Sequence, residues 1–350
     1  MQKGRGIEKV LEELVRQNSV KKDYVAEVSA LSIDFVEGNN KPVLRGINGP
    51  LELTEWAHKQ FSKYLKIPNM YYNKMRLEDK KLFADNANTW LRMKEDNRLI
   101  RVVDNRIRAF LPTNYRPVDC LDLGTNLLPV FKENGLNVVS SEVTETNFYL
   151  KALILEKEFE IKSKVVGDVL NFGVAVRGSE VGAGGIKIEP FVNRLVCTNG
   201  MIASKSIKEF GLTKGDEWGE VNKFFSKETL SEINTAFIMK VKDVIKGIMS
   251  DEAILALIDK LQNAFLEKVA INRPEVFINK LVSFLGLTKA KEDITKNFIE
   301  DADYSRYGAM NAITKAANAE SNYDFATALE YAGDRVLSLS QTQWNVLQHA

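Results

Sequence analysis

The chain has 350 residues, 45% of them hydrophobic and 27% charged, a composition that is typical of a folded soluble protein and excludes a disordered one. A formal net charge of +1 at pH 7 excludes a uniformly basic nucleic-acid coat, although a nearly neutral chain can still gather charge on one surface. The two cysteines, Cys120 and Cys197, make no disulfide framework and suit a reducing compartment. The N-terminal residues MQKGRGIEKVLEELV lack the continuous apolar region that is typical of a signal peptide, and no apolar run approaches membrane-spanning length. We therefore expect a cytoplasmic protein without a membrane partner.

The N-terminal part of the chain predicts a mostly helical lobe, which we place at residues 1–91. Apolar residues recur there at the spacing of amphipathic helices, interrupted by Gly, Asn and Pro. In chain order the pattern predicts a helix over 7–17, strand or irregular structure over 24–38, a loop over 38–50, a helix capped by Thr54 that ends at Pro68, a short helix around 71–75, and a helix from about 77 to 91.

A β-hairpin with a basic face is predicted around Asp104 and Asn105. Short runs of alternating apolar residues flank this pair, whose side chains tolerate the positive φ of a two-residue turn. In that register Arg101 lies opposite Arg108. The alternation then sends one set of side chains to an apolar face (Ile100, Val102, Ile107, Ala109) and another to a basic face (Arg101, Arg106, Arg108, Phe110).

The remaining chain predicts a sheet followed by helices. Residues 117–134 predict a helix with a kink at Pro129, and four strands follow between residues 137 and 201. Helical periodicity begins near Ser226 and continues to the end. We therefore predict an α+β fold: a mainly antiparallel sheet with a basic β-hairpin, flanked by an N-terminal helical lobe and an all-helical C-terminal half. The expected parts are 1–91, 92–215 and 216–350, with the boundary most strongly indicated at 211–222.

The hairpin and its surroundings are the predicted functional site. From Arg92 to Arg116, seven basic residues stand against three acidic ones, a local charge of +4. Basic side chains interleaved with aromatic rings are what a single-stranded nucleic-acid groove needs, since cations bind phosphates and bases stack on rings. A different interpretation is that the arginines pair with acids of the helical half or are simply solvated. The candidate nucleic-acid-binding residues are Arg98, Arg101, Arg106, Arg108, Phe110, Tyr115, Arg116 and Arg194.

Catalytic and metal-binding patterns are absent. The only histidines are His58 and His349, too few for a histidine-based site, and we interpret His58 as structural. The run GSEVGAGGIK lacks the Lys-Ser/Thr of a phosphate loop and joins two strands. The acids Asp119, Asp122, Asp168 and Glu189 show no metal-ligand spacing. We expect no catalytic residue, no metal and no cofactor.

The segment NRLVCTNGM at residues 193–201 contributes Arg194 at the edge of a strand. Its Asn199-Gly200 pair predicts a tight turn or the entry to a helix, and we favour a turn that closes the sheet before the helical half begins.

Several short motifs together resemble a phage- and plasmid-borne family known only as a domain of unknown function (number nine-three-two). They are IPNMYYNKM, NTWL, IRVVDNRIRAFLPTNYRPVD, RLVCTNGM and YGAMNAITKAAN, in this order between about residues 50 and 335. The resemblance implies a mobile-element setting and no activity. More weakly, a hairpin, a helix and an antiparallel sheet with a basic face are similar to single-strand annealing proteins of the Rad-fifty-two type, an analogy of fold alone.

These observations lead us to expect a nucleic-acid-binding protein of a phage or mobile element, which binds single-stranded DNA or RNA and assembles as a homo-oligomer. The analogy of fold further implies a role in single-strand DNA annealing and recombination. The first alternative is a protein–protein interaction protein that blocks or scaffolds a host factor without binding nucleic acid. The second is a metal-dependent nuclease built on scattered carboxylates.

Overall fold

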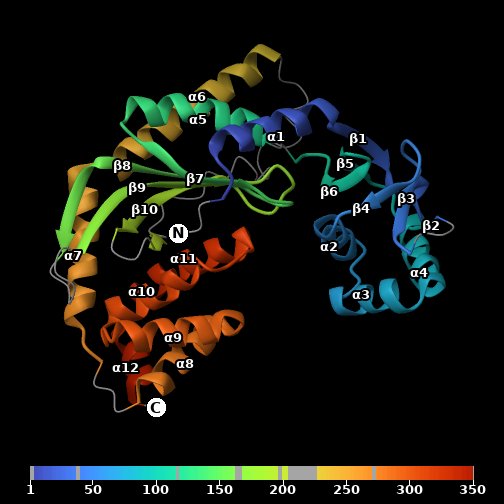
Figure 1. Cartoon of the computed structure of the whole chain (residues 1–350). Coiled ribbons are helices and arrows are strands. Elements are labelled where there is room, and N and C mark those ends of the chain that lie inside the picture. Colours follow the sequence, from blue (N-terminus) through green and yellow to red (C-terminus); the bar gives the residue numbers. More distant parts are fainter. Residues whose placement is uncertain are drawn as a thin grey trace.

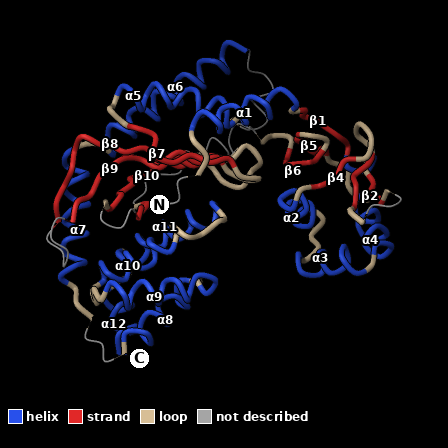
Figure 2. Tube along the Cα trace, viewed as in Figure 1, coloured by secondary structure: helices blue, strands red, loops and turns tan. Residues whose placement is uncertain are grey.

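The structure is a computed structural model that describes residues 4–36, 40–115, 118–161, 168–195, 199–203, 227–269 and 273–349. It is an α+β fold built on two curled, mostly antiparallel sheets. The sheets lie side by side, and each has its own helices (Figure 1). Figure 2, which is coloured by secondary structure, shows the strands in two separate groups. Helices lie above and below the five-stranded group, which is the second sheet.

The first sheet has six strands, and three helices cover one of its faces. The strands are β1 (Lys22–Glu27), β2 (Ser32–Phe35), β3 (Pro42–Arg45), β4 (Leu51–Leu53), β5 (Asn97–Val103) and β6 (Arg106–Pro112), and the helices are α2 (Glu55–Tyr64), α3 (Asn69–Glu78) and α4 (Lys80–Arg92). The strand order is β1-β5-β6-β4-β3-β2, with β4 and β6 parallel. Ile100 and Ile107 of the sheet share one apolar core with Phe61, Tyr72 and Phe83 of the helices.

The second sheet has five antiparallel strands in the order β11-β10-β9-β8-β7. They are β7 (Asn137–Val143), β8 (Phe148–Ile161), β9 (Asp168–Gly178), β10 (Lys187–Arg194) and β11 (Asn199–Ile202). Three helices share an apolar core with one face: α1 (Ile7–Val20), α5 (Cys120–Glu133) and α6 (Lys227–Ile248). On the other side lie α7 (Asp251–Leu266), α8 (Pro274–Leu285), α9 (Lys291–Asp301), α10 (Arg306–Ala316), α11 (Tyr323–Leu337) and α12 (Gln341–His349).

The hairpin of β5 and β6 closes at the predicted two residues, and a β-bulge changes its register. Asp104 and Asn105 have φ values of 51° and 57°, which their short polar side chains tolerate. Val102 pairs with Ile107, but Arg101 pairs with Ala109, so Arg108 is the extra residue of a bulge. Beyond the bulge the alternation reverses: Phe110 joins the core of the first sheet, and Ala109 faces away from that core. The predicted faces of these two residues were therefore wrong.

The arrangement of the elements differs from the prediction in three places. The hairpin pairs with β1 and β4, so it belongs to the first sheet and not to the sheet of β7–β11. The N-terminal part is not a helical lobe, since it supplies β1–β4, and β3 falls in the expected loop. Asn199 and Gly200 lie within β11 and pair with Arg194 and Asn193 instead of forming a turn.

The expected division of the chain stays a prediction, because residues 211–222 lie outside the described residues. The first sheet takes strands from both sides of the expected boundary at residue 91. None of the described helices combines the length and apolarity that crossing a membrane requires.

Candidate functional site

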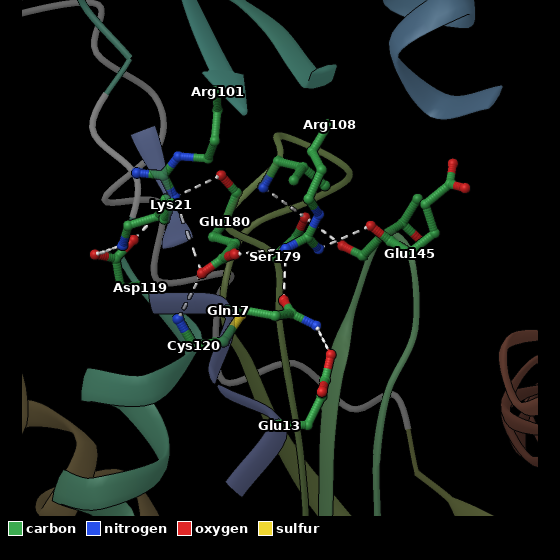
Figure 3. Close-up of polar contacts among 12 residues, drawn as sticks. Glu13, Gln17, Lys21, Arg101, Arg108, Asp119, Cys120, Glu145, Ser179 and Glu180 are labelled. Carbon is green, nitrogen blue, oxygen red and sulfur yellow. Dashed lines mark hydrogen bonds and ion pairs between the residues drawn. The ribbon is translucent and has the colours of Figure 1, made fainter. Parts of the chain in front are cut away.

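Arg101 lies in the interior, where the first sheet meets the second sheet and its helices, which we call the second-sheet unit. Only 2% of Arg101 is exposed. Its Nε and Nη2 donate to the two carboxylate oxygens of Asp23 at 3.0 and 2.8 Å. Its Nη1 donates to Oδ1 of Asp119 at 2.8 Å (Figure 3). Bidentate pairing of this kind is the strongest arrangement of a guanidinium and a carboxylate. Arg101 therefore joins β5 to β1 and to the residue that precedes α5.

Arg108, at the bulge, is also buried and also paired. Its Nη1 donates to Oε1 of Glu180 at 2.9 Å and to Oε1 of Gln17 at 2.7 Å, and its Nη2 donates to the carbonyl oxygen of Glu145 at 3.1 Å (Figure 3). The other carboxylate oxygen of Glu180 accepts from the backbone N–H of Cys120 at 3.0 Å. Arg108 therefore ties the hairpin to α1, to the turn between β7 and β8, and to the connection between β9 and β10.

These contacts correct the role predicted for Arg101 and Arg108. Three cations and three carboxylates balance each other in what we call the joint cluster: Lys21, Arg101, Arg108, Asp23, Asp119 and Glu180. Moving Arg108 to an external phosphate would leave the buried carboxylate of Glu180 without its partner, at a cost of several kcal/mol. Moving Arg101 would break its hydrogen bonds to the partly exposed carboxylates of Asp23 and Asp119. The two arginines are therefore structural in this arrangement. The interpretation that they pair with the protein's own acids holds, although none of these acids comes from the helical half.

Phe110 and Arg194 are likewise interior residues. Phe110 is 3% exposed and packs against the rings of Phe61 and Tyr64, at centroid distances of 5.3 and 5.2 Å. In the second sheet, Nε and Nη2 of Arg194 donate to the carboxylate of Asp168 at 2.6 and 2.8 Å. The structure therefore does not bring Arg194 together with the hairpin arginines.

Two of the sequence motifs, RLVCTNGM and YGAMNAITKAAN, are joined by buried hydrogen bonds. The side-chain amide of Asn199 donates to Oδ1 of Asn311 at 3.1 Å and to Oγ1 of Thr314 at 2.7 Å. The hydroxyl of Tyr307 donates to Asp168 at 3.2 Å. RLVCTNGM and YGAMNAITKAAN thus supply a buried polar layer that holds α10 against β10 and β11.

Arg106 is exposed at the start of β6. It lines a hollow of about 300 Å³ in which acids accompany the other arginines. Arg16 there pairs with Glu13 at 2.8 Å and with Asp104 at 2.9 Å, so this hollow is not a strongly basic surface. Arg116 lies outside the described residues.

Arg98 and Tyr115 do come together, in an open groove of about 590 Å³ beside α2. The groove lies where α2, the end of the hairpin and the connection between β9 and β10 approach one another. We call it the α2 groove. Its lining residues are Trp56, Lys59, Gln60, Lys63, Tyr64, Arg98, Phe110, Leu111, Pro112, Tyr115 and Gly182.

The spacing of residues along α2 explains why this helix builds the groove. Ala57, Phe61 and Leu65 are buried in the core of the first sheet. The groove residues of α2 fall at positions i, i+3, i+4, i+7 and i+8, which share the neighbouring stripe of a helix. Thr54 fixes the start of α2, since its Oγ1 accepts from the N–H of Ala57 at 3.2 Å.

The α2 groove is basic. Lys59, Lys63 and Arg98 line it, and its described lining holds no carboxylate. Lys59 and Lys63 are exposed, and no ion pair of either is found among the described residues. Arg98 is different, because its Nε donates to Asp96 at 3.2 Å. Three cations therefore face the solvent of the groove. Among the described residues Lys59 and Lys63 form no ion pair, although Lys59 interacts electrostatically with Glu55 one turn before it.

Aromatic rings lie among these cations. The guanidinium of Arg98 lies 4.1 Å from the centre of the Tyr64 ring, and the ammonium of Lys94 lies 5.1 Å from it, both within the range of cation–π attraction. Burial, together with the hydrogen bond to Asp96, raises the pKa of Tyr64 to about 12. Burial also raises the pKa of Tyr115 to about 12. Both phenols are therefore neutral at pH 7 and add no negative charge to the groove.

Sequence reasoning missed most of this groove. Trp56 and Tyr64 are half-buried on this helix, and neither was among the predicted site residues. The sequence did contain a signal for the groove: Lys59 and Lys63, spaced i, i+4, lie between the aromatic residues Trp56 and Tyr64. This signal was not decisive, because the same pattern occurs on ordinary solvated helices.

The part of the chain that the structure describes holds no candidate metal site, and its buried His58 is not suited to catalysis. No three His, Cys, Asp or Glu side chains gather there in a group that could hold a metal ion. His58 is 3% exposed, and its Nδ1 lies 2.8 Å from the hydroxyl of Tyr72. Burial lowers the pKa of His58 to about 3, so the ring is a neutral packing residue.

Comparisons with protein families, with curated protein sequences and with solved structures gave no match. The geometry of the site is therefore what the functional proposal depends on.

Proposed function

We propose that this protein binds single-stranded nucleic acid in the α2 groove. The observation that carries the proposal is the combination of three cations and three aromatic side chains (Trp56, Tyr64, Tyr115) in one open groove without a lining carboxylate. This is the composition that the sequence led us to expect at the hairpin, now on a neighbouring surface. Of the predicted residues, Arg98 and Tyr115 keep their role in the proposal.

The chemistry of the groove fits a single strand. Lys59, Lys63 and Arg98 supply charge for phosphates, and each base stacked on an aromatic ring contributes roughly 1–3 kcal/mol. Bases inside a duplex are already stacked and paired, so they cannot use the rings without being extruded. A volume of about 590 Å³ lies within the range of small ligand sites, which suits a short stretch of a strand. A mobile-element setting, a role in annealing, homo-oligomeric assembly and a cytoplasmic location stay predictions from the sequence.

The test is fluorescence anisotropy with a labelled single-stranded oligonucleotide at several salt concentrations. Three phosphate contacts at roughly −0.7 each predict a slope of about −2 for log K against log salt. The double variant Lys59→Glu with Lys63→Glu removes two of the contacts and adds repulsion. We expect it to bind at least about tenfold more weakly, with a slope near −0.7.

A matched control is available on α6. Lys242 and Lys246 have the same i, i+4 spacing, and Lys246 lies in the last turn of its helix, as Lys63 does. Lys242 also pairs with Glu133 at 3.5 Å, but both side chains are exposed, so loss of this pair costs at most about 1 kcal/mol. Lys242→Glu with Lys246→Glu should therefore bind like the unmodified protein. Absence of binding at low salt would reject the proposal and favour the protein–protein interaction alternative. Equal losses in the two double variants would reject the α2 groove as the binding site.

A further inference from the structure

One wall of the α2 groove comes from the second sheet. The connection between β9 and β10 spans residues 179–186, and its first part, residues 179–183, reaches across to the first sheet. The carbonyl oxygen of Val181 accepts two hydrogen bonds from α2, one from Nε1 of Trp56 and one from Nε2 of Gln60, both at 2.8 Å. Oε1 of Gln60 accepts from the backbone N–H of Phe110 at 2.8 Å. A single backbone oxygen thus fixes the direction of the Trp56 ring.

The connection is itself held in place from both ends. Oγ of Ser179 donates to the carbonyl oxygen of Thr146 at 2.6 Å and accepts from the N–H of Ala183 at 3.0 Å. Glu180 belongs to the joint cluster and accepts from Arg108 (Figure 3). Val181 is completely buried. The segment therefore approaches α2 as an element that hydrogen bonds hold in place.

Gly182 makes this close approach possible. Its φ is +75°, a conformation that L-residues rarely adopt, and a Cβ there would lie 2.7 Å from Cδ2 of Leu111 and 3.2 Å from Nε2 of Gln60. Leu111 is buried, so it cannot swing freely away. A side chain at position 182 would be strained by the positive φ and would require Leu111 or the connection itself to shift, which disturbs the bonds from Trp56 and Gln60 to Val181.

A second contact from the same unit orients the start of α2. The backbone N–H of Trp56 donates to Oε1 of Glu145, in the turn between β7 and β8, at 2.9 Å. The helix that carries Lys59 and Lys63 is thus seated on the second-sheet unit by its N-terminus as well as by the Val181 oxygen.

We propose that residues 179–183 are the positioning element of the α2 groove, with Gly182 as the residue that allows Val181 to orient Trp56 toward a nucleobase. This inference rests on the proposed function. Gly182 is a positioning residue, because it acts through Trp56. The positioning affects the recognition of bases and leaves the attraction of phosphates by Lys59 and Lys63 unchanged.

The experiment compares Gly182→Ala with Gly184→Ala in the full chain. A Cβ at Gly184 would meet only the far end of the Arg177 side chain, at 3.3 Å, so this variant controls for the loss of a glycine in the same segment. For each protein, anisotropy gives the affinity for an oligonucleotide and for an abasic oligomer of equal length. The ratio of the two affinities isolates base stacking, and the salt slope isolates phosphate binding.

We expect Gly182→Ala to lower the ratio about tenfold, the loss of roughly one stacked base, with the salt slope unchanged. Gly184→Ala should keep the ratio of the unmodified protein. Trp56→Phe keeps a ring but removes the donor to Val181, so it should also lower the ratio, and it decides the matter if Gly182→Ala does not fold. Ratios unchanged in Gly182→Ala and in Trp56→Phe would overturn the inference. Failure of the unmodified protein to bind either oligomer would instead overturn the proposed function.

Discussion

Replacement of Arg101 by alanine should destabilise the joint between the sheets far more than loss of an exposed arginine with a similar partner. Arg101 is 2% exposed and donates three hydrogen bonds to the carboxylates of Asp23 and Asp119. Breaking a buried ion pair by removing one partner costs about 3–5 kcal/mol, because the remaining charges lose their compensation. The carboxylates of Asp23 and Asp119 are 35% and 26% exposed, so water can solvate them in part. We therefore expect a value at the lower end, about 3 kcal/mol.

Arg45 is the matched control, since it lies in β3 of the same sheet and pairs with Asp34 at 2.8 Å. Both of those side chains are about half exposed, and exposed pairs contribute at most about 1 kcal/mol. Hydrogen exchange of peptides from β1 and β5 measures the opening of this joint separately from the rest of the chain. An Arg101→Ala loss of about 3 kcal/mol corresponds to exchange about 100-fold faster, since each 1.4 kcal/mol is a factor of ten. If Arg45→Ala accelerates exchange in β5 as much as Arg101→Ala does, the assignment of Arg101 to a stabilising cluster is refuted.

Two further predictions concern His58 and the selectivity of the α2 groove. Burial lowers the pKa of His58 to about 3, so the folded state disfavours the proton; its contribution is complete above the ordinary pKa of about 6.5 and is lost as the pH falls from there toward 3. The free energy of unfolding, measured with urea, should therefore fall less from pH 7 to pH 4.5 in His58→Gln than in the unmodified protein. An equal fall in the two proteins would contradict this prediction. In the groove, Nε1 of Trp56 and both ends of the Gln60 amide already bond to the backbone, which leaves little to read a base edge or a 2′-hydroxyl. Oligo-dT, oligo-dC and oligo-rU should therefore bind within about threefold of one another at equal salt, and a preference of tenfold would show direct readout.

The sequence determined the features that depend on neighbouring residues. Thr54 caps α2 as predicted, because a capping hydroxyl acts on the adjacent turn of helix. The predicted end at Pro68 was wrong, since α2 already ends at Tyr64 and Pro68 directly precedes α3. Asp104 and Asn105 turn the hairpin for the same kind of reason, since their own side chains tolerate the left-handed backbone. The α+β class followed from the periodicities of the segments.

Only the tertiary structure decided which surface is basic. The partners of Arg101 are Asp23 and Asp119, which are 78 and 18 residues away in the sequence, and those of Arg108 include Glu180, 72 residues away. The bulge at Arg108 reversed the face of Phe110, because one extra residue shifts every later side chain to the other side of the sheet. Charge patterning along a segment counts cations, but it does not reveal which carboxylates the fold brings to them. The fold pairs Arg101 and Arg108 with carboxylates. Lys59 and Lys63 on α2 face solvent instead.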